Sequence, residues 1–124
     1  MEPRIRYARA GDGTAIAFWT AGTAIDLLHL PWLRWGHAQL EWQNPELNLW
    51  YERLLARCRL IRYDGRGSGL SDHASVSYGV GAKVTDMEAV LERLKLTRVA
   101  ILASLNMGPA ALTYAVQHPN QVSP

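Results

Sequence analysis

The feature that most constrains this fold is a short apolar run followed at once by a helical pattern. Residues 99–102 (VAIL) are the kind of segment that forms a buried parallel strand. Apolar residues then recur at helical spacing over residues 110–118, and Pro119 ends that pattern. The sequence therefore predicts a strand, a tight turn and a helix, with the turn at the carboxyl edge of a sheet and beside the free N–H groups that open the helix.

Residues 98–123 resemble the nucleophile-elbow region of α/β-hydrolases, whose motif G-x-S-x-G lies between a strand and a helix. Aligned on the helix, the five motif positions fall on residues 103–107 (ASLNM), which places Leu105 at the apex. A frame with Ser104 as nucleophile puts Leu102 and Asn106 at flanking positions that need small residues. Sterics favour the Leu105 frame, and Ser104 is then either a displaced nucleophile or a small polar residue of the turn.

A second segment, residues 63–72 (YDGRGSGLSD), resembles the same family's Y-D-x-R-G-x-G-x-S motif. Its closely spaced glycines indicate unusual backbone conformations, and an aspartate can accept hydrogen bonds from such a backbone or from a nearby arginine. We interpret the segment as structural rather than as a phosphate-binding loop, because no G-x-x-x-x-G-K-[ST] pattern is present. The motif residues are Asp64, Arg66, Gly67, Gly69 and Ser71.

The remaining pattern predicts strands and helices in an order that also resembles α/β-hydrolases. Strands are expected at residues 5–8, 15–19, 25–30 and 59–63, with a hairpin turn at Asp12 and Gly13 between the first two. Helices are expected at residues 46–57 and 84–94, whereas residues 31–45 give no clear pattern. The resemblance implies an α/β fold with a mostly parallel sheet in the order 1-2-4-3-5, helices on both faces, and a truncated α/β-hydrolase architecture.

The resemblance also implies where an oxyanion hole would lie. In α/β-hydrolases one donor N–H comes from the residue after the nucleophile and another from the loop after the third strand. Here those positions correspond to Asn106 and to the backbone near Trp32 and Leu33, while Pro31 has no N–H to donate. The tryptophans of this region resemble a subgroup of bacterial α/β-hydrolase domains, some fused to adenylate cyclase modules. They are equally well explained as core and surface-covering aromatics.

The family triad runs in the order serine, acid, histidine, with the last two beyond the elbow helix. The sequence given reaches Pro124 directly after that helix, so we expect none of its four histidines to fill the family position. His73 or His118 could act as a base only in a rearranged fold. We therefore expect a homologue without a complete triad, catalytically impaired or inactive. The alternative is a weak esterase or lactonase that uses Ser104 and backbone N–H donors.

Composition limits the other possibilities. The 124 residues are expected to form one domain, 1–124, with 48% hydrophobic and 19% charged residues. A net charge of +2 without a basic run argues against nucleic-acid binding, and no 18-residue apolar stretch predicts a membrane span. Cys58 is the single cysteine, so neither an intrachain disulfide nor a thiolate metal cluster is expected. We expect no cofactor and a cytoplasmic location.

The partners expected are a small ester or lactone and a second copy of the chain. In the family order, the strand containing Val99 and Leu102 would lie at the edge of the sheet with one side bare. An apolar strand edge favours pairing with another chain. We therefore expect a homo-oligomer joined through this edge.

Overall fold

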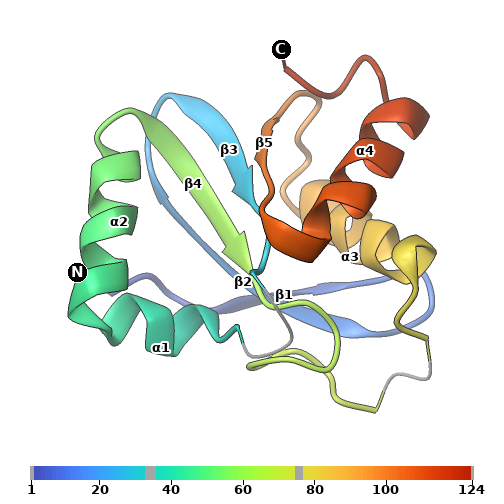
Figure 1. The fold of residues 1–124 in the computed structure, drawn as a ribbon, viewed down its shortest axis with the longest axis horizontal. Coiled ribbons are helices and arrows are strands. Elements are labelled where there is room, and N and C mark those ends of the chain that lie inside the picture. Colours follow the sequence, from blue (N-terminus) through green and yellow to red (C-terminus); the bar gives the residue numbers. More distant parts are fainter. Residues whose placement is uncertain (1, 33–35, 75–76, 124) are drawn as a thin grey trace.

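A five-stranded sheet with the strand order β1-β2-β4-β3-β5 forms the centre of the fold (Figure 1). The computed structural model describes residues 2–32, 36–74 and 77–123. The strands are β1 (Arg6–Arg9), β2 (Ala15–Gly22), β3 (Ile25–His29), β4 (Cys58–Tyr63) and β5 (Ala100–Leu102). The predicted strand order is confirmed.

The sheet is mixed. β1 pairs antiparallel with β2, and β2 pairs antiparallel with β4, whereas β4, β3 and β5 are mutually parallel neighbours. The predicted hairpin is present, and Gly13 has a φ of +89° in its turn, a conformation that glycine adopts without steric cost. Parallel neighbours require crossover connections, and helices supply them. They are α1 (Ala38–Gln43), α2 (Pro45–Leu55) and α3 (Val80–Arg93), and α4 (Gly108–Gln117) follows β5.

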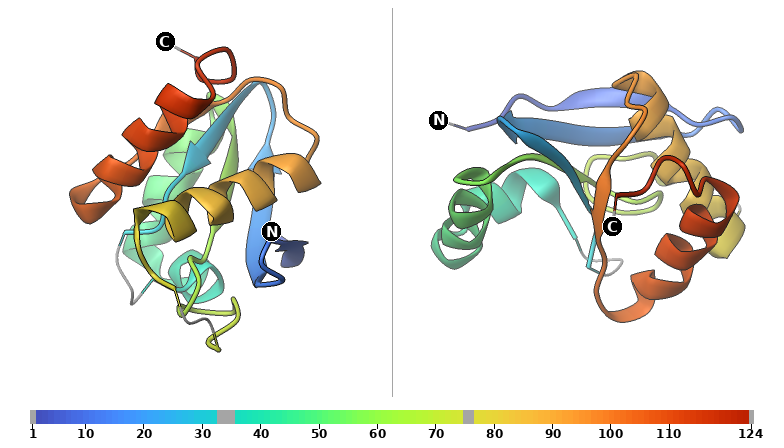
Figure 2. Two further views of the ribbon diagram at one scale, coloured as in Figure 1. Left: turned by 90° about the vertical axis from the view of Figure 1, so that its right-hand side faces the viewer. Right: turned by 90° about the horizontal axis from the view of Figure 1, so that it is seen from above.

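The helices cover both faces of the sheet, as predicted, and each face has its own core. In the left view of Figure 2, α3 and α4 lie in front of the strands and α1 and α2 lie behind them. Alternation along β2 sends Phe18 into the α3–α4 core and Trp19 into the α1–α2 core, and both are fully buried. Each such burial contributes roughly 1.5–3 kcal/mol, so the two cores together hold the sheet between its helical layers.

Helix α1 was not predicted, because its six residues are too few for a periodic pattern. Its first turn is capped by His37, whose Nδ1 accepts a hydrogen bond from the Leu40 N–H at 3.2 Å. Asn44 then caps α2 by accepting from two backbone N–H groups. The helix predicted over residues 46–57 ends at Leu55, and Cys58 begins β4, where it is buried.

The expectation of a bare strand edge also needs correction. Val99 forms a parallel bridge with Val122, through hydrogen bonds from Val99 N–H to Gln121 O and from Ser123 N–H to Val99 O. The chain therefore returns from α4 and lies along the start of the edge, because Val122 is an apolar β-branched residue suited to a strand. Beyond Val99, no strand of the described residues pairs with this side of β5.

No helix within the described ranges is both long enough and apolar enough to cross a membrane.

Candidate functional site

The chain turns sharply from β5 into α4 through a single 3-10 turn, η1 (Leu105–Met107). Ser104 is extended, with φ −135° and ψ 160°, whereas Leu105 has a φ of +54°. A non-glycine residue at positive φ costs about 1–3 kcal/mol, and such residues are held in place by the surrounding structure. The strained residue of this turn is therefore Leu105, and its side chain is 73% exposed.

Ser104 is exposed next to this point, and its side chain does not cap the turn. Within the described part of the chain, no side chain or backbone group forms a hydrogen bond with its hydroxyl. A serine hydroxyl becomes a useful nucleophile only when a neighbouring base accepts its proton. The positions of the imidazoles therefore decide what Ser104 can do.

Each of the four imidazoles contacts a partner away from Ser104. The contacts join His29 to Trp50, His37 to Leu40 N–H, His73 to Gly69 O, and His118 to Glu88. None of these contacts involves Ser104, so in the described structure no imidazole forms a hydrogen bond with its hydroxyl.

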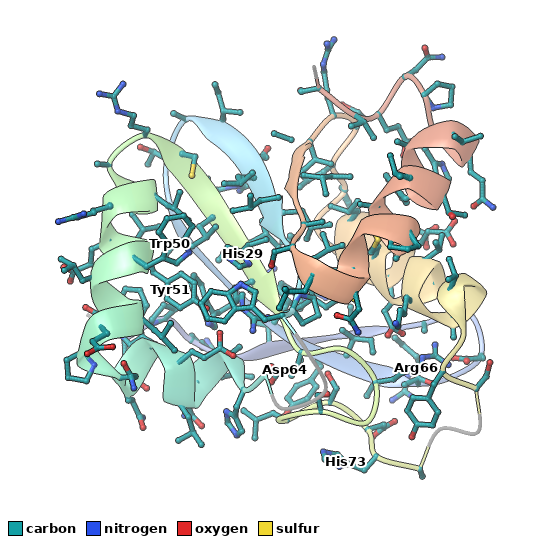
Figure 3. The ribbon with its side chains drawn as sticks, viewed as in Figure 1. His29, Trp50, Tyr51, Asp64, Arg66 and His73 are labelled. Atoms are coloured by element: carbon teal, nitrogen blue, oxygen red, sulfur yellow. The ribbon has the colours of Figure 1, made fainter. Side chains whose placement is uncertain are left out.

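His29 is the histidine closest in the sheet to this turn, because it lies opposite Leu102 in the β3–β5 register. Figure 3 shows its ring beside Trp50 and Tyr51, on the α2 side of the sheet. The Trp50 indole can only donate, so His29 Nε2 accepts its hydrogen bond at 3.2 Å and Nδ1–H donates to Leu30 O at 3.0 Å. Burial and the nearby Arg62 charge lower the pKa of His29 from 6.5 to about 4, which keeps it neutral.

The loop after β3 lies beside the turn after β5. Leu30 N–H donates to Leu102 O at 2.9 Å, so the two segments leave the sheet together. Trp32 is half-buried with its ring centroid 5.8 Å from that of His29, and Leu33 lies outside the described residues. Among the described groups, none accepts a hydrogen bond from the Asn106 N–H. One backbone donor is thus available beside Leu105.

The carboxylate of Asp64 organises the loop after β4. Its Oδ1 accepts from the Ala38 N–H at 2.7 Å and its Oδ2 from the Leu70 N–H at 3.0 Å. Gly69 has a φ of +50°, and a Cβ at that position would collide with the same carboxylate. Ser71 Oγ donates to the Asp64 carbonyl at 2.6 Å and accepts from the Ala17 N–H at 2.8 Å. These contacts bind the loop to α1 and β2.

Arg66 joins the same loop to α3 and to the first hairpin. Its guanidinium pairs with Asp86 at 2.9 Å and with Asp12 at 2.7 Å, and its backbone N–H donates to Asp86 at 3.1 Å. The Arg66 and Asp86 side chains are both buried. Figure 3 shows Arg66 on the α3 side of the molecule and Asp64 toward the α1 side, so one loop contacts both helical layers.

A cavity of about 290 Å³ opens between this loop, α3 and η1. Pro31, Arg66 and Asn106 all line it, so the structure brings together three segments that are far apart in the sequence. Tyr63, Tyr78 and Lys83 line it as well, and sequence analysis did not identify them as site residues. Over the described ranges, no group of three His, Cys, Asp or Glu side chains is placed to hold a metal ion.

Solved structures share this arrangement. A hydrolase from Pseudomonas aeruginosa PA01 matches with a TM-score of 0.81 and 22% identity, over 97% of this chain and 43% of its own. An esterase from Exiguobacterium antarcticum matches with a TM-score of 0.78 and 30% identity, over 94% and 42%. An alpha/beta hydrolase fold protein from Burkholderia ambifaria matches with a TM-score of 0.74 and 23% identity, over 99% and 42%.

This chain has the amino-terminal half of the α/β-hydrolase fold. It spans less than half the length of the structures described above. No protein-family model matches the sequence, and a search of curated proteins finds no similar one.

The sequence patterns did not predict a buried polar cluster formed by Arg62, Glu41 and Tyr51. Arg62 Nη2 donates to both carboxylate oxygens of Glu41, at 2.8 and 2.7 Å, and Arg62 Nε lies 3.1 Å from the Tyr51 hydroxyl, which also bonds to Glu41. Burial opposes ionisation of Glu41, but Arg62 and Tyr51 outweigh it and hold the pKa of Glu41 below its usual range. The available signal was Arg62 itself, an arginine between Ile61 and Tyr63 of β4, since a buried arginine requires a buried partner.

Proposed function

We propose that this chain is a hydrolase-fold domain that does not hydrolyse esters through an activated serine of its own. The observation that carries the proposal is the conformation of Leu105. It has the positive φ at the strand-to-helix turn, where the family motif carries its nucleophile. An aliphatic side chain has neither a lone pair to attack a carbonyl nor a proton to transfer.

The imidazole contacts support the same conclusion. Each of the four histidines already contacts Trp50, Leu40, Gly69 or Glu88. His29 is the nearest in the sheet register, yet it is buried and its Nε2 is occupied by the Trp50 N–H. Recruiting it as a base would break that hydrogen bond and expose a core residue. We therefore expect no general base for Ser104 from this chain.

The second candidate function is a weak esterase or lactonase with Ser104 as displaced nucleophile. Two observations favour it: the Ser104 side chain is exposed, and the Asn106 N–H has no acceptor among the described residues, as an oxyanion donor requires. Similar solved structures include two esterases and an N-acyl homoserine lactone degrading enzyme. A small ester or lactone is the ligand class that this candidate implies.

A nitrophenyl acetate assay separates the two candidates. We expect wild type and Ser104→Ala to release nitrophenol at the same slow rate, near that of an unrelated protein at equal concentration. A rate in wild type that falls at least about tenfold in Ser104→Ala would contradict the first proposal and support the second. The matched control is Ser123→Ala, since Ser123 lies outside the turn. A cytoplasmic location stays a prediction.

A further inference from the structure

The outer side of β5 carries few backbone groups, because only alternate residues of a strand point that way. Leu102 points inward, since its carbonyl accepts a hydrogen bond from the Leu30 N–H on the β3 side. Val99 and Ile101 therefore point outward. Among the described residues, no backbone group pairs with Ile101 on that side, whereas both backbone groups of Val99 are bonded. The free part of this edge is thus centred on Ile101.

Residues 119–123, which we call the latch, occupy the Val99 part of the edge. The chain turns back after α4 toward β5 (Figure 1), and the Gln121 N–H donates to the His118 carbonyl at 3.0 Å. The Val99 N–H donates to the Gln121 carbonyl at 2.8 Å, and the Val99 carbonyl accepts from the Ser123 N–H at 2.9 Å. The latch therefore pairs with Val99 as a neighbouring parallel strand would, but over a single bridge.

A side-chain hydrogen bond fixes the latch to α4. The Tyr114 hydroxyl donates to Gln121 Oε1 at 2.9 Å, and Tyr114 itself is buried. Gln121 therefore contacts α4 through its side chain and β5 through its carbonyl. The Tyr114 ring also stacks on His118, with centroids 4.4 Å apart, and His118 Nε2 lies 3.1 Å from Glu88 of α3. The position of the latch thus depends on how α4 packs on α3.

The latch is held less firmly than the other side of β5. Its bridge covers one residue, whereas β3 and β5 pair over three residue pairs. Val122 is only partly buried where it packs against the α3–α4 core. A segment with few backbone hydrogen bonds and little buried apolar surface opens locally while the remaining fold stays intact. Opening of the latch frees the Val99 backbone, so that Val99 and Ile101 can both accept a new strand.

We propose that the latch competes with a second copy of the chain for the backbone of Val99, so that two β5 edges pair fully only when the latch is open. Two such edges can pair antiparallel about a two-fold axis, because each offers the same row of groups to the other. Pairing through Ile101 alone gives a shorter ladder than pairing through Val99 and Ile101, so the closed latch weakens association. The proposal goes beyond the function proposed above, because it concerns association and does not depend on Ser104.

The apparent dissociation constant of the dimer should fall as the fraction of open latch rises. Tyr114→Phe and Gln121→Ala each remove the same side-chain hydrogen bond from the closed latch. One such bond corresponds to about a two- to tenfold change in an equilibrium constant. We therefore expect each substitution to tighten the dimer by about that factor. The double variant should match the single variants, because all three lose one and the same bond.

Two measurements on the full chain test the proposal. Sedimentation velocity over a dilution series gives the dissociation constant of the dimer. Amide hydrogen exchange at Val99, at a dilution where the monomer predominates, reports opening of the latch. Exchange at Val99 should be about two- to tenfold faster in both variants than in wild type. Exchange of the β3 amides should be unchanged, which distinguishes local opening from a general loss of stability.

Matched controls are Tyr7→Phe, at an exposed tyrosine of β1, and Gln43→Ala, which removes an exposed hydrogen bond to Glu2. Neither should change the dissociation constant or the exchange rate at Val99. The proposal is overturned if either latch variant dimerises no more tightly than wild type, or if exchange at Val99 is not accelerated. It is also overturned if the β3 amides are accelerated equally, or if no form of the chain dimerises at high micromolar concentration.

Discussion

His29 is a residue that burial and the nearby Arg62 charge keep neutral. The Trp50 N–H occupies its Nε2, so adding a proton there requires that bond to break inside the α2 core. The imidazole is therefore stable in the fold only while it is neutral. This couples the state of one side chain to the packing of α2 on the sheet.

We expect stability to fall as the pH is lowered through the range from 6.5 to about 4. The pKa of His29 is about 4 in the folded chain and 6.5 when unperturbed, so the unfolded state binds the extra proton first. The stabilisation is complete above pH 6.5 and falls by up to about 3 kcal/mol toward pH 4. Urea unfolding at several pH values, for wild type and His29→Gln, measures it. Parallel pH dependences in the two proteins would contradict the prediction.

Gly69 shows how one residue can fix a loop. It combines a φ of +50° with a position where a Cβ would collide with the Asp64 carboxylate. Gly69→Ala should therefore lower the free energy of unfolding by at least about 2 kcal/mol, through strain and disruption of the Asp64 hydrogen bonds. The matched substitution Gly81→Ala lies inside α3 with open space around it and should raise stability by up to about 1 kcal/mol. If both substitutions change the free energy of unfolding equally, contact of the new Cβ with the Asp64 carboxylate does not determine the effect at Gly69.

At the scale of elements, the Arg62–Glu41–Tyr51 cluster connects β4 to α1 and α2. Glu41→Gln should destabilise the chain by about 3–5 kcal/mol, because it leaves the Arg62 charge buried and uncompensated. The control is Asp26→Asn, which breaks the partly exposed pair with Arg59 and should cost no more than about 1 kcal/mol. Urea unfolding of both variants gives the comparison. If Glu41→Gln lowers the free energy of unfolding less than Asp26→Asn does, the cluster does not stabilise the packing of α1 and α2 on β4.

The elements that sequence patterns predicted are those with strong local signals. Asp12 and Gly13 mark a hairpin turn, and the glycines around Arg66 mark a loop after a strand. Helix α1 has no such signal, because it depends on a cap from His37 and on contacts with the rest of the chain. The cavity likewise depends on Lys83, Tyr78 and Asn106 meeting in space, and no spacing in the sequence reveals that. Helix α1 and the cavity therefore depend on tertiary contacts, which local sequence patterns do not reveal.

The sheet edge beyond Val99 is the feature of the whole molecule that bears on whether two copies could pair. The backbone carbonyl of Leu102 accepts a hydrogen bond from Leu30 N–H, on the β3 side of β5. Backbone groups of successive strand residues point to opposite sides, so those of Ile101 point to the outer edge of the sheet, past the bridge at Val99. Leu112 and Val116 lie one helical turn apart on α4 and are 70% and 80% exposed. Exposed apolar residues on a helix and an unpaired strand edge each favour association.

We propose that two copies of the chain associate through this edge and the adjacent face of α4. Light scattering coupled to size-exclusion chromatography at low micromolar concentration should give the mass of a dimer. Leu112→Lys should shift the population toward the monomer, because it places a charge on the proposed interface, whereas Leu49→Lys on α2 should leave the mass unchanged. A monodisperse monomer of the unmodified chain would exclude this association.

We propose that Ser104 is not activated, because Leu105 occupies the strained position of the turn. Reaction with a fluorophosphonate probe, read by intact mass spectrometry and peptide mapping, tests it most directly, since the probe adds only to an activated hydroxyl. We predict no adduct on the folded chain beyond that found on the urea-unfolded chain. A stoichiometric adduct on Ser104 of the folded chain, absent from Ser104→Ala, would contradict the claim.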